Sequence, residues 1–83
     1  MADDSRPLRT PRLTREMIAQ SRVIAKGQAI REVDRLVRQY GGRAARWAKK
    51  SSPLFVRSGR RFEYHWYEQH GIGRREIRLK EVP

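Results

Sequence analysis

Cysteine is absent from this chain of 83 residues, and histidine occurs only twice, at His65 and His70. Without thiols the protein cannot form disulfide bridges, use a thiolate as a nucleophile or bind zinc through cysteine. Two histidines are also too few for an ordinary histidine-rich metal site. We therefore predict that the protein uses neither a metal ion nor another cofactor.

Long apolar runs are missing as well. No apolar run exceeds four residues, whereas a membrane-spanning helix needs about 20. The N-terminal segment begins acidic, turns basic and contains no apolar stretch of the kind found in a signal peptide. We therefore expect a cytoplasmic protein with no membrane partner. The length allows one small domain and leaves no room for a separate nucleotide-binding domain.

Acidic residues are scarce relative to basic ones, nine against 20, which gives a formal net charge of +11. Sixteen of the 20 cations are arginines, whose planar guanidinium binds phosphate in two-point contacts and stacks on bases. This excess indicates a polyanionic partner, with nucleic acid as the first candidate. An acidic protein surface is the second candidate. A genomic preference for arginine, combined with the solubility that net charge provides, is the third explanation.

The composition separates a short arm from a single domain. Residues 1–12 contain two prolines and five charges but almost nothing to bury, which predicts a disordered basic arm. Residues 13–83 are predicted to form one small α+β domain, helical over 13–50 and a β-meander over 53–82. Three arginines of the arm at a spacing of three suit a phosphate backbone, although such a segment is more often a solvated tail.

The helical part shows a clear apolar period. Apolar residues recur at helical spacing between Val23 and Tyr40, and Gly41-Gly42 supplies a left-handed cap after them. Gly27 weakens the pattern, because glycine costs about 1 kcal/mol relative to alanine inside a helix. Residues 13–40 are therefore predicted to form one kinked helix or a helix pair.

The last thirty residues alternate between apolar and polar side chains, which is typical of strands. Strands are predicted over 54–57, 61–69 and 74–82, with a hairpin turn at Ser58-Gly59. The middle strand presents one apolar and one polar side, since successive side chains point to opposite faces. The apolar side carries Phe62, Tyr64 and Trp66, and the polar side carries Glu63, His65 and Tyr67.

The fold class that follows is α+β. An N-terminal helix or helix pair, plus a short helix over 43–50, is predicted to pack on a three- to four-stranded antiparallel β-meander. Trp47 is expected to anchor the short helix on the core, and Pro53 ends that helix, because the residue before a proline leaves the helical region.

The polar side of the meander forms a candidate catalytic cluster. Neighbouring strands lie about 4.8 Å apart, so side chains from two strands can converge on one ligand. A carboxylate or histidine can take the proton of an RNA 2′-hydroxyl, and cations can stabilise the charged phosphorane without a metal. Cross-strand ion pairing without catalysis explains the same pattern, and a register shift of one residue would invert both faces. The nominated residues are Glu63, His65, Tyr67, Arg78 and Lys80, with Glu76 beside them.

Within this cluster, Glu63 or His65 is predicted to be the base and the other the acid or the orienting group. Tyr67 would stack a base or orient a phosphate, and Arg78 with Lys80 would hold the phosphate. Five further cations are predicted to bind nucleic acid, with RNA favoured. They are Arg31, Arg35 and Arg38 on one helix face, and Arg74 and Arg75 on the closing strand.

The second half of the chain also contains a run of distinctive residues at scattered positions. They are Tyr40-Gly41-Gly42, Trp47, Lys49 or Lys50 with Ser51-Ser52, Phe62 through Glu68, and Gly73 through Lys80. This run resembles the C-terminal toxin module of bacterial polymorphic toxins, over about residues 37–80. The resemblance implies a compact ribonuclease of barnase- or RelE-like architecture, with the matching positions Glu63, His65, Tyr67 and Lys80 as site residues. It also implies an acidic immunity or antitoxin protein as a partner.

One departure from the family pattern leaves alternatives open. Such modules normally follow a large delivery protein, whereas this chain begins with its own methionine and a basic arm. Either a toxin domain has been freed, or the scaffold serves as a non-catalytic, basic nucleic-acid-binding or accessory subunit of a larger assembly. A weaker alternative is a transcriptional regulator with residues 28–40 as the recognition helix of a helix-turn-helix.

Overall fold

The computed structural model describes residues 12–83 and confirms the predicted α+β class. Nearly all of the predicted basic arm, residues 1–11, lies outside the described part of the chain. None of the described helices is long and apolar enough to cross a membrane. In chain order the elements are α1 (Arg15–Ala19), β1 (Arg22–Lys26), the 3₁₀ turn η1 (Gly27–Ala29), α2 (Val33–Tyr40), the 3₁₀ turn η2 (Ala44–Arg46), β2 (Ala48–Ser51), β3 (Phe55–Arg57), β4 (Arg60–Gln69) and β5 (Gly73–Glu81).

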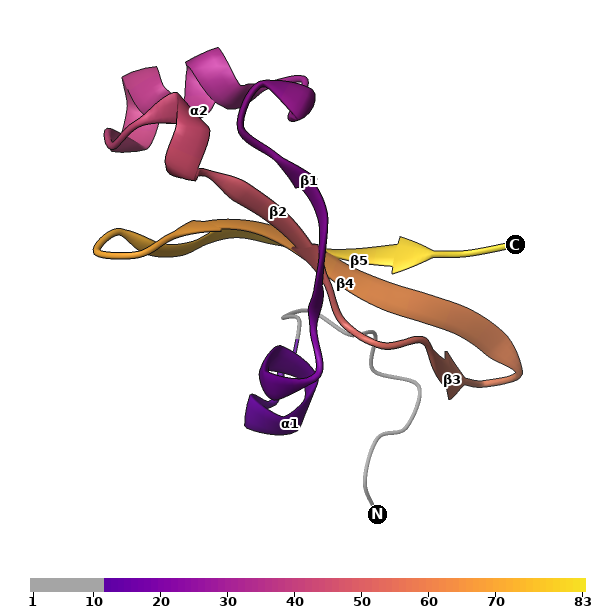
Figure 1. Ribbon diagram of the computed structural model, residues 1–83. Coiled ribbons are helices and arrows are strands. Elements are labelled where there is room, and N and C mark those ends of the chain that lie inside the picture. The colour runs from indigo at the N-terminus through magenta and orange to yellow at the C-terminus, as the bar shows by residue number, and fades with distance from the viewer. Residues whose placement is uncertain (1–11) are drawn as a thin grey trace.

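The five strands form one antiparallel sheet built around β4. β2 and β3 pair with different halves of one edge of β4, and β1 pairs with β2. β5 follows the other edge of β4. In Figure 1, β4 and β5 form a long twisted ribbon across the molecule, with α2 above it and α1 below it.

Two of the five strands come from the segment 13–50, which the sequence pattern assigned to helices. α1 is only five residues long, and β1 follows it. Val23 and Ile24 are β-branched, which favours extended backbone, and the backbone of β1 forms its hydrogen bonds with β2. Val23 is 53% exposed and does not belong to the helical apolar face. Likewise, β2 occupies the second half of the helix expected over 43–50.

An apolar cluster joins α2 to the sheet. Val33 and Leu36 lie three residues apart on α2 and are buried, as the helical spacing predicted. Ile30 is buried in the same cluster but precedes the helix, in extended backbone. Trp47 is fully buried, and its Nε1 donates to the carbonyl of Gly41 at 3.1 Å. The prediction that this tryptophan anchors the core is confirmed. The buried members of the cluster are Ile30, Val33, Leu36, Trp47 and Tyr67.

A β-bulge in β5 breaks the alternation on which the strand predictions relied. His65 pairs with Arg78 and Tyr67 pairs with Arg75, so a single residue of β4 faces two residues of β5. Glu76 lies at this bulge with a φ of +58°, which is uncommon for a residue with a side chain. Beyond the bulge, Arg75 shares a face with Tyr67, whereas strict alternation from Arg78 would place it on the opposite face.

Candidate active site

The nominated catalytic residues lie on one face of the sheet, which we call the dyad face. Alternation along β4 places Glu63, His65 and Tyr67 on this face. On β5, Lys80 pairs directly with Glu63, and Arg78 pairs directly with His65, so these side chains also project from the dyad face. The structure therefore brings these side chains to one face of the sheet, with Glu63 beside Lys80 and His65 beside Arg78.

Tyr67 has a different environment from its neighbours on the dyad face. It is only 3% exposed and packs in the apolar cluster that joins α2 to the sheet. Glu63 and His65 precede Tyr67 on β4 and keep 14% and 16% of their side-chain surface exposed. The main role of Tyr67 is thus to form the core, and it cannot offer its ring freely as a stacking platform for a base.

Glu63 is the hub of the polar contacts on the dyad face. Its Oε1 lies 3.0 Å from Nε2 of His65 and accepts a hydrogen bond from Oγ of Ser51, also at 3.0 Å. Its Oε2 accepts a hydrogen bond from Nη2 of Arg22 at 3.3 Å. The bond with His65 is the largest cause that lowers the pKa of Glu63. Burial opposes this shift, and Ser51 and Arg22 reinforce it.

The ionisation of Glu63 determines the tautomer of His65. A carboxylate can only accept hydrogen bonds, so Nε2 of His65 must carry the proton in the bond that joins the two side chains. In neutral His65, the lone pair is then on Nδ1. With this tautomer His65 could accept a proton at Nδ1 while Glu63 orients its ring, which is one of the two predicted assignments. An ionised Glu63 cannot act as the acid.

Three cations flank the Glu63–His65 pair. Arg78 and Lys80 are exposed on β5, and Arg22 on β1 keeps 57% of its side chain exposed. Arg22 pairs with Ser51 and Ser51 pairs with His65, so one row across the sheet runs from Arg22 through Ser51 and His65 to Arg78. An anion placed over His65 would meet a guanidinium on either side.

The helical row of arginines does not form a continuous binding ridge. Arg35 binds both oxygens of Glu76 at 2.9 Å and also bonds Glu32 and Gln39, so its donors are already engaged. This bonding lowers the pKa of Glu76 to about 2. Arg38 remains exposed on α2, and Arg31 is exposed in the turn before it.

The two arginines nominated on β5 lie on opposite faces. Arg75 belongs to the dyad face, and its guanidinium lies 5.5 Å from the ring centroid of Tyr40. Arg74 pairs with Glu68, whose side chain lies on the other face, two residues from Trp66. The bulge at Glu76 accounts for this placement, because it moves the residues beyond it out of the alternation set by Arg78 and Lys80.

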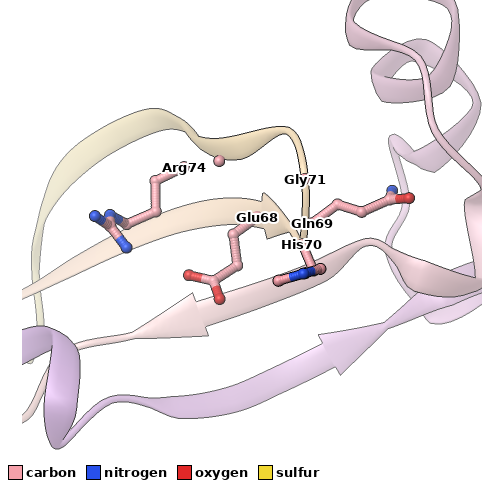
Figure 2. A pocket seen from close by; sticks show the side chains of 6 residues that line it. Glu68, Gln69, His70, Gly71 and Arg74 are labelled. Atoms are coloured by element: carbon pink, nitrogen blue, oxygen red, sulfur yellow. The ribbon is translucent and has the colours of Figure 1, made fainter.

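A second polar cluster surrounds the turn between β4 and β5 and lines a hollow of about 230 Å³. Figure 2 shows Glu68, His70 and Arg74 around it, with the side chain of Gln69 pointing away. Glu68 accepts hydrogen bonds from Nε1 of Trp66 at 2.8 Å and forms an ion pair with Lys50 at 3.2 Å. His70 is exposed. Within residues 12–83, no group of three or more potential metal ligands is present.

Three residues of the dyad face were missed by the sequence analysis. The helices expected over 13–40 and 43–50 include Arg22 and Lys49, and Ser51 follows the second of them. Each reaches this face only because β1 and β2 pair with β4 through long-range hydrogen bonds. No local period in the sequence signals such pairing, although the β-branched pair Val23-Ile24 was a sign of a strand.

The comparisons with known proteins bring no family assignment. No family model, curated protein or solved structure matches the chain.

Proposed function

We propose that this chain is a small RNA-directed, toxin-like protein that cleaves RNA without a metal ion. The observation that carries the proposal is the pair formed by ionised Glu63 and His65, with Arg78 directly opposite His65 on β5. The pair holds one imidazole nitrogen ready to accept a proton. The cations beside it suit a phosphate, and the overall charge of +11 suits a polyanion.

The proposed reaction is a transphosphorylation. Nδ1 of His65 accepts the proton of the 2′-hydroxyl, and Glu63 stabilises the imidazolium that results. The 2′-oxygen bonds to phosphorus while the bond from phosphorus to the 5′-oxygen breaks, and the leaving oxygen takes a proton from water. The hydroxide that remains takes the proton from the imidazolium, which restores neutral His65. Arg78 and Lys80 stabilise the negative charge on the phosphorane. The products are a 2′,3′-cyclic phosphate and a 5′-hydroxyl.

This mechanism specifies RNA as the substrate, because DNA lacks the 2′-hydroxyl that serves as the nucleophile. RNA as the substrate would place the activity in the cytoplasm. An acidic immunity or antitoxin protein would be the expected partner, since its surface could cover the cations of the dyad face and associate rapidly through charge.

The test incubates the protein in EDTA with total RNA and, as a control that lacks the 2′-hydroxyl, with DNA. We expect the wild type to cleave RNA and leave DNA intact, and His65→Ala to reduce the rate at least 100-fold. Glu63→Gln keeps the shape but removes the charge that stabilises the imidazolium, so a smaller loss is expected. His70→Ala is the matched control, because His70 is exposed on the turn outside the pair. Intact RNA with the wild type, or equal rates for His65→Ala and His70→Ala, would refute catalysis.

A second candidate is RNA binding without cleavage. The observation that favours it is the saturation of Glu63, whose contacts with Arg22, Ser51 and His65 also describe a structural cross-strand network. In that case the wild type would bind RNA and leave it intact. His65→Ala would then lower the stability of the protein, and no RNA product would form with either the wild type or the variant.

A further inference from the structure

Two residues of the dyad face, Tyr67 and Arg78, line a second hollow of about 290 Å³. Arg78, which pairs directly with His65, is part of its wall, and Tyr67 lies two residues beyond His65 on β4. The remaining walls come from β1, β2, the end of η1 and the segment between η1 and α2. The lining residues are Ala25, Ala29, Ile30, Arg31, Glu32, Lys49, Tyr67 and Arg78.

The hollow is lined by buried apolar residues and by basic residues, which we call its floor and its rim. Ile30 and Tyr67 form the floor, and each is only 3% exposed and belongs to the apolar cluster. Lys49 is half-buried on β2, with Nζ 6.0 Å from the centroid of the Tyr67 ring. Arg31 and Arg78 are exposed on different elements, so three cations from three parts of the chain line one concavity.

The carboxylates near the hollow do not cancel this charge. Glu32 lines it, but its Oε1 accepts a hydrogen bond from Nε of Arg35 at 3.0 Å. Glu76, which is close enough to Arg78 for the two charges to interact, is held by the same arginine through both oxygens. The carboxylates Glu32 and Glu76 are therefore both bonded to Arg35, which does not line the hollow. The three cations that do line it are left in excess. The rim that remains positive consists of Arg31, Lys49 and Arg78.

We propose that this hollow is a phosphate-binding subsite that holds an RNA backbone phosphate next to the one attacked at His65. The assignment of the anion to RNA rests on the proposed function, whereas the capture of a phosphate rests on the hollow alone. A small concave site with a few convergent polar groups is the usual form of a ligand pocket. Arginine and lysine together supply the donors that a phosphate needs.

The position of the subsite has a consequence for the substrate. Arg78 lies both opposite His65 and on the wall of the hollow, so it would contact the attacked phosphate and its neighbour. A dinucleotide with two phosphates would then bind more tightly than a single nucleotide. The small side chains of Ala25 and Ala29 leave the space that the anion occupies.

The test measures binding by calorimetry at low ionic strength, with uridine monophosphate, inorganic phosphate and uridine as probes. Lys49→Met and Arg31→Ala are each expected to weaken uridine monophosphate binding about tenfold, the effect of losing one charged hydrogen bond. The matched controls are Lys26→Met and Arg46→Ala, which remove the same charges at exposed positions outside the hollow. These controls are expected to change the affinity less than twofold. Uridine without phosphate is expected not to bind.

The outcomes separate the subsite from the proposed catalysis. Binding lost in the two hollow variants but kept in the controls supports the subsite, even if the wild type leaves RNA intact. Equal losses in hollow and control variants would show that net charge alone attracts the anion, and the subsite would be refuted. Absence of binding by either phosphate probe would also refute it, even where RNA is cleaved. Equal binding of uridine and uridine monophosphate would assign the hollow to the nucleoside and overturn the proposal.

Discussion

Arg35 on α2 grips both carboxylate oxygens of Glu76 on β5, with Nη1 and Nη2 each 2.9 Å from one oxygen. The hydroxyl of Tyr40 donates to the same carboxylate at 2.8 Å. This contact joins residues 41 positions apart in the chain and attaches the helix to the bulge in the sheet. The contact thereby holds α2 against the sheet at the bulge of β5.

The first prediction concerns stability in acid. The folded protein holds the pKa of Glu76 at about 2, below its ordinary value of 4.5, so the unfolded chain binds a proton at a higher pH than the folded protein does. The stabilisation is complete above the unfolded value and is lost as the pH falls through the folded one. We expect the free energy of unfolding, measured with urea, to decrease from about pH 5 towards pH 2. Glu76→Gln should flatten this dependence, and an equal slope in the variant would contradict the prediction.

The second prediction compares two carboxylates at neutral pH. Glu76→Gln removes a two-point, partly buried ion pair and should cost about 1–2 kcal/mol of unfolding free energy. Glu81→Gln removes the pair between Glu81 and Arg60, whose side chains are 47% and 62% exposed. That change should cost less than Glu76→Gln does, because solvent screens an exposed ion pair. Urea unfolding of both variants checks the order, and a larger loss for Glu81→Gln would be inconsistent with the structure.

The third prediction compares two neighbouring glycines with positive φ. A Cβ at Gly42 would lie 2.6–2.7 Å from the side-chain amide of Gln69, whereas a Cβ at Gly41 meets nothing within 4 Å. The Gln69 amide is bonded at 3.1 Å to both the N–H and the carbonyl of Arg43, so it cannot move without losing these bonds. We expect backbone strain of about 1–3 kcal/mol in both variants, and a further loss of about 1–2 kcal/mol in Gly42→Ala, because its Cβ displaces the Gln69 amide. Equal melting temperatures for the two variants would disprove the close contact.

The fourth prediction concerns the salt dependence of RNA binding. If phosphates contact the cations of the dyad face, the logarithm of the affinity should fall linearly with the logarithm of the salt concentration. Arg78→Ala should weaken binding and reduce the magnitude of this slope by about one. Arg57→Ala, at an exposed position near the turn between β3 and β4, is the control with the same charge change. An affinity that is independent of salt would argue against phosphate contacts.

Several features of the fold could be predicted from local patterns. The apolar spacing of Val33 and Leu36 reflects α2, because a helix brings positions three residues apart to one face. The strict alternation around His65 reflects β4, because strand geometry imposes a period of two. The placement of Glu63 and His65 on one face follows from that period alone. The excess of basic over acidic residues is a property of the composition and does not depend on the fold.

The tertiary structure alone decided the rest. The strand state of Arg22–Lys26 and Ala48–Ser51 depends on hydrogen bonds to partners far along the chain, and short segments carry too little local preference to determine it. The bulge lies at Glu76, whose carboxylate binds Arg35 and Tyr40 from α2. Because these partners lie far away in the chain, the residue pattern of β5 does not predict the bulge. By itself, then, the sequence determined that a basic α+β protein would present Glu63 and His65 together. Only long-range pairing decided that Ser51, Arg22 and Lys49 would join them and that Tyr67 would be buried, because packing and sheet register depend on the whole chain.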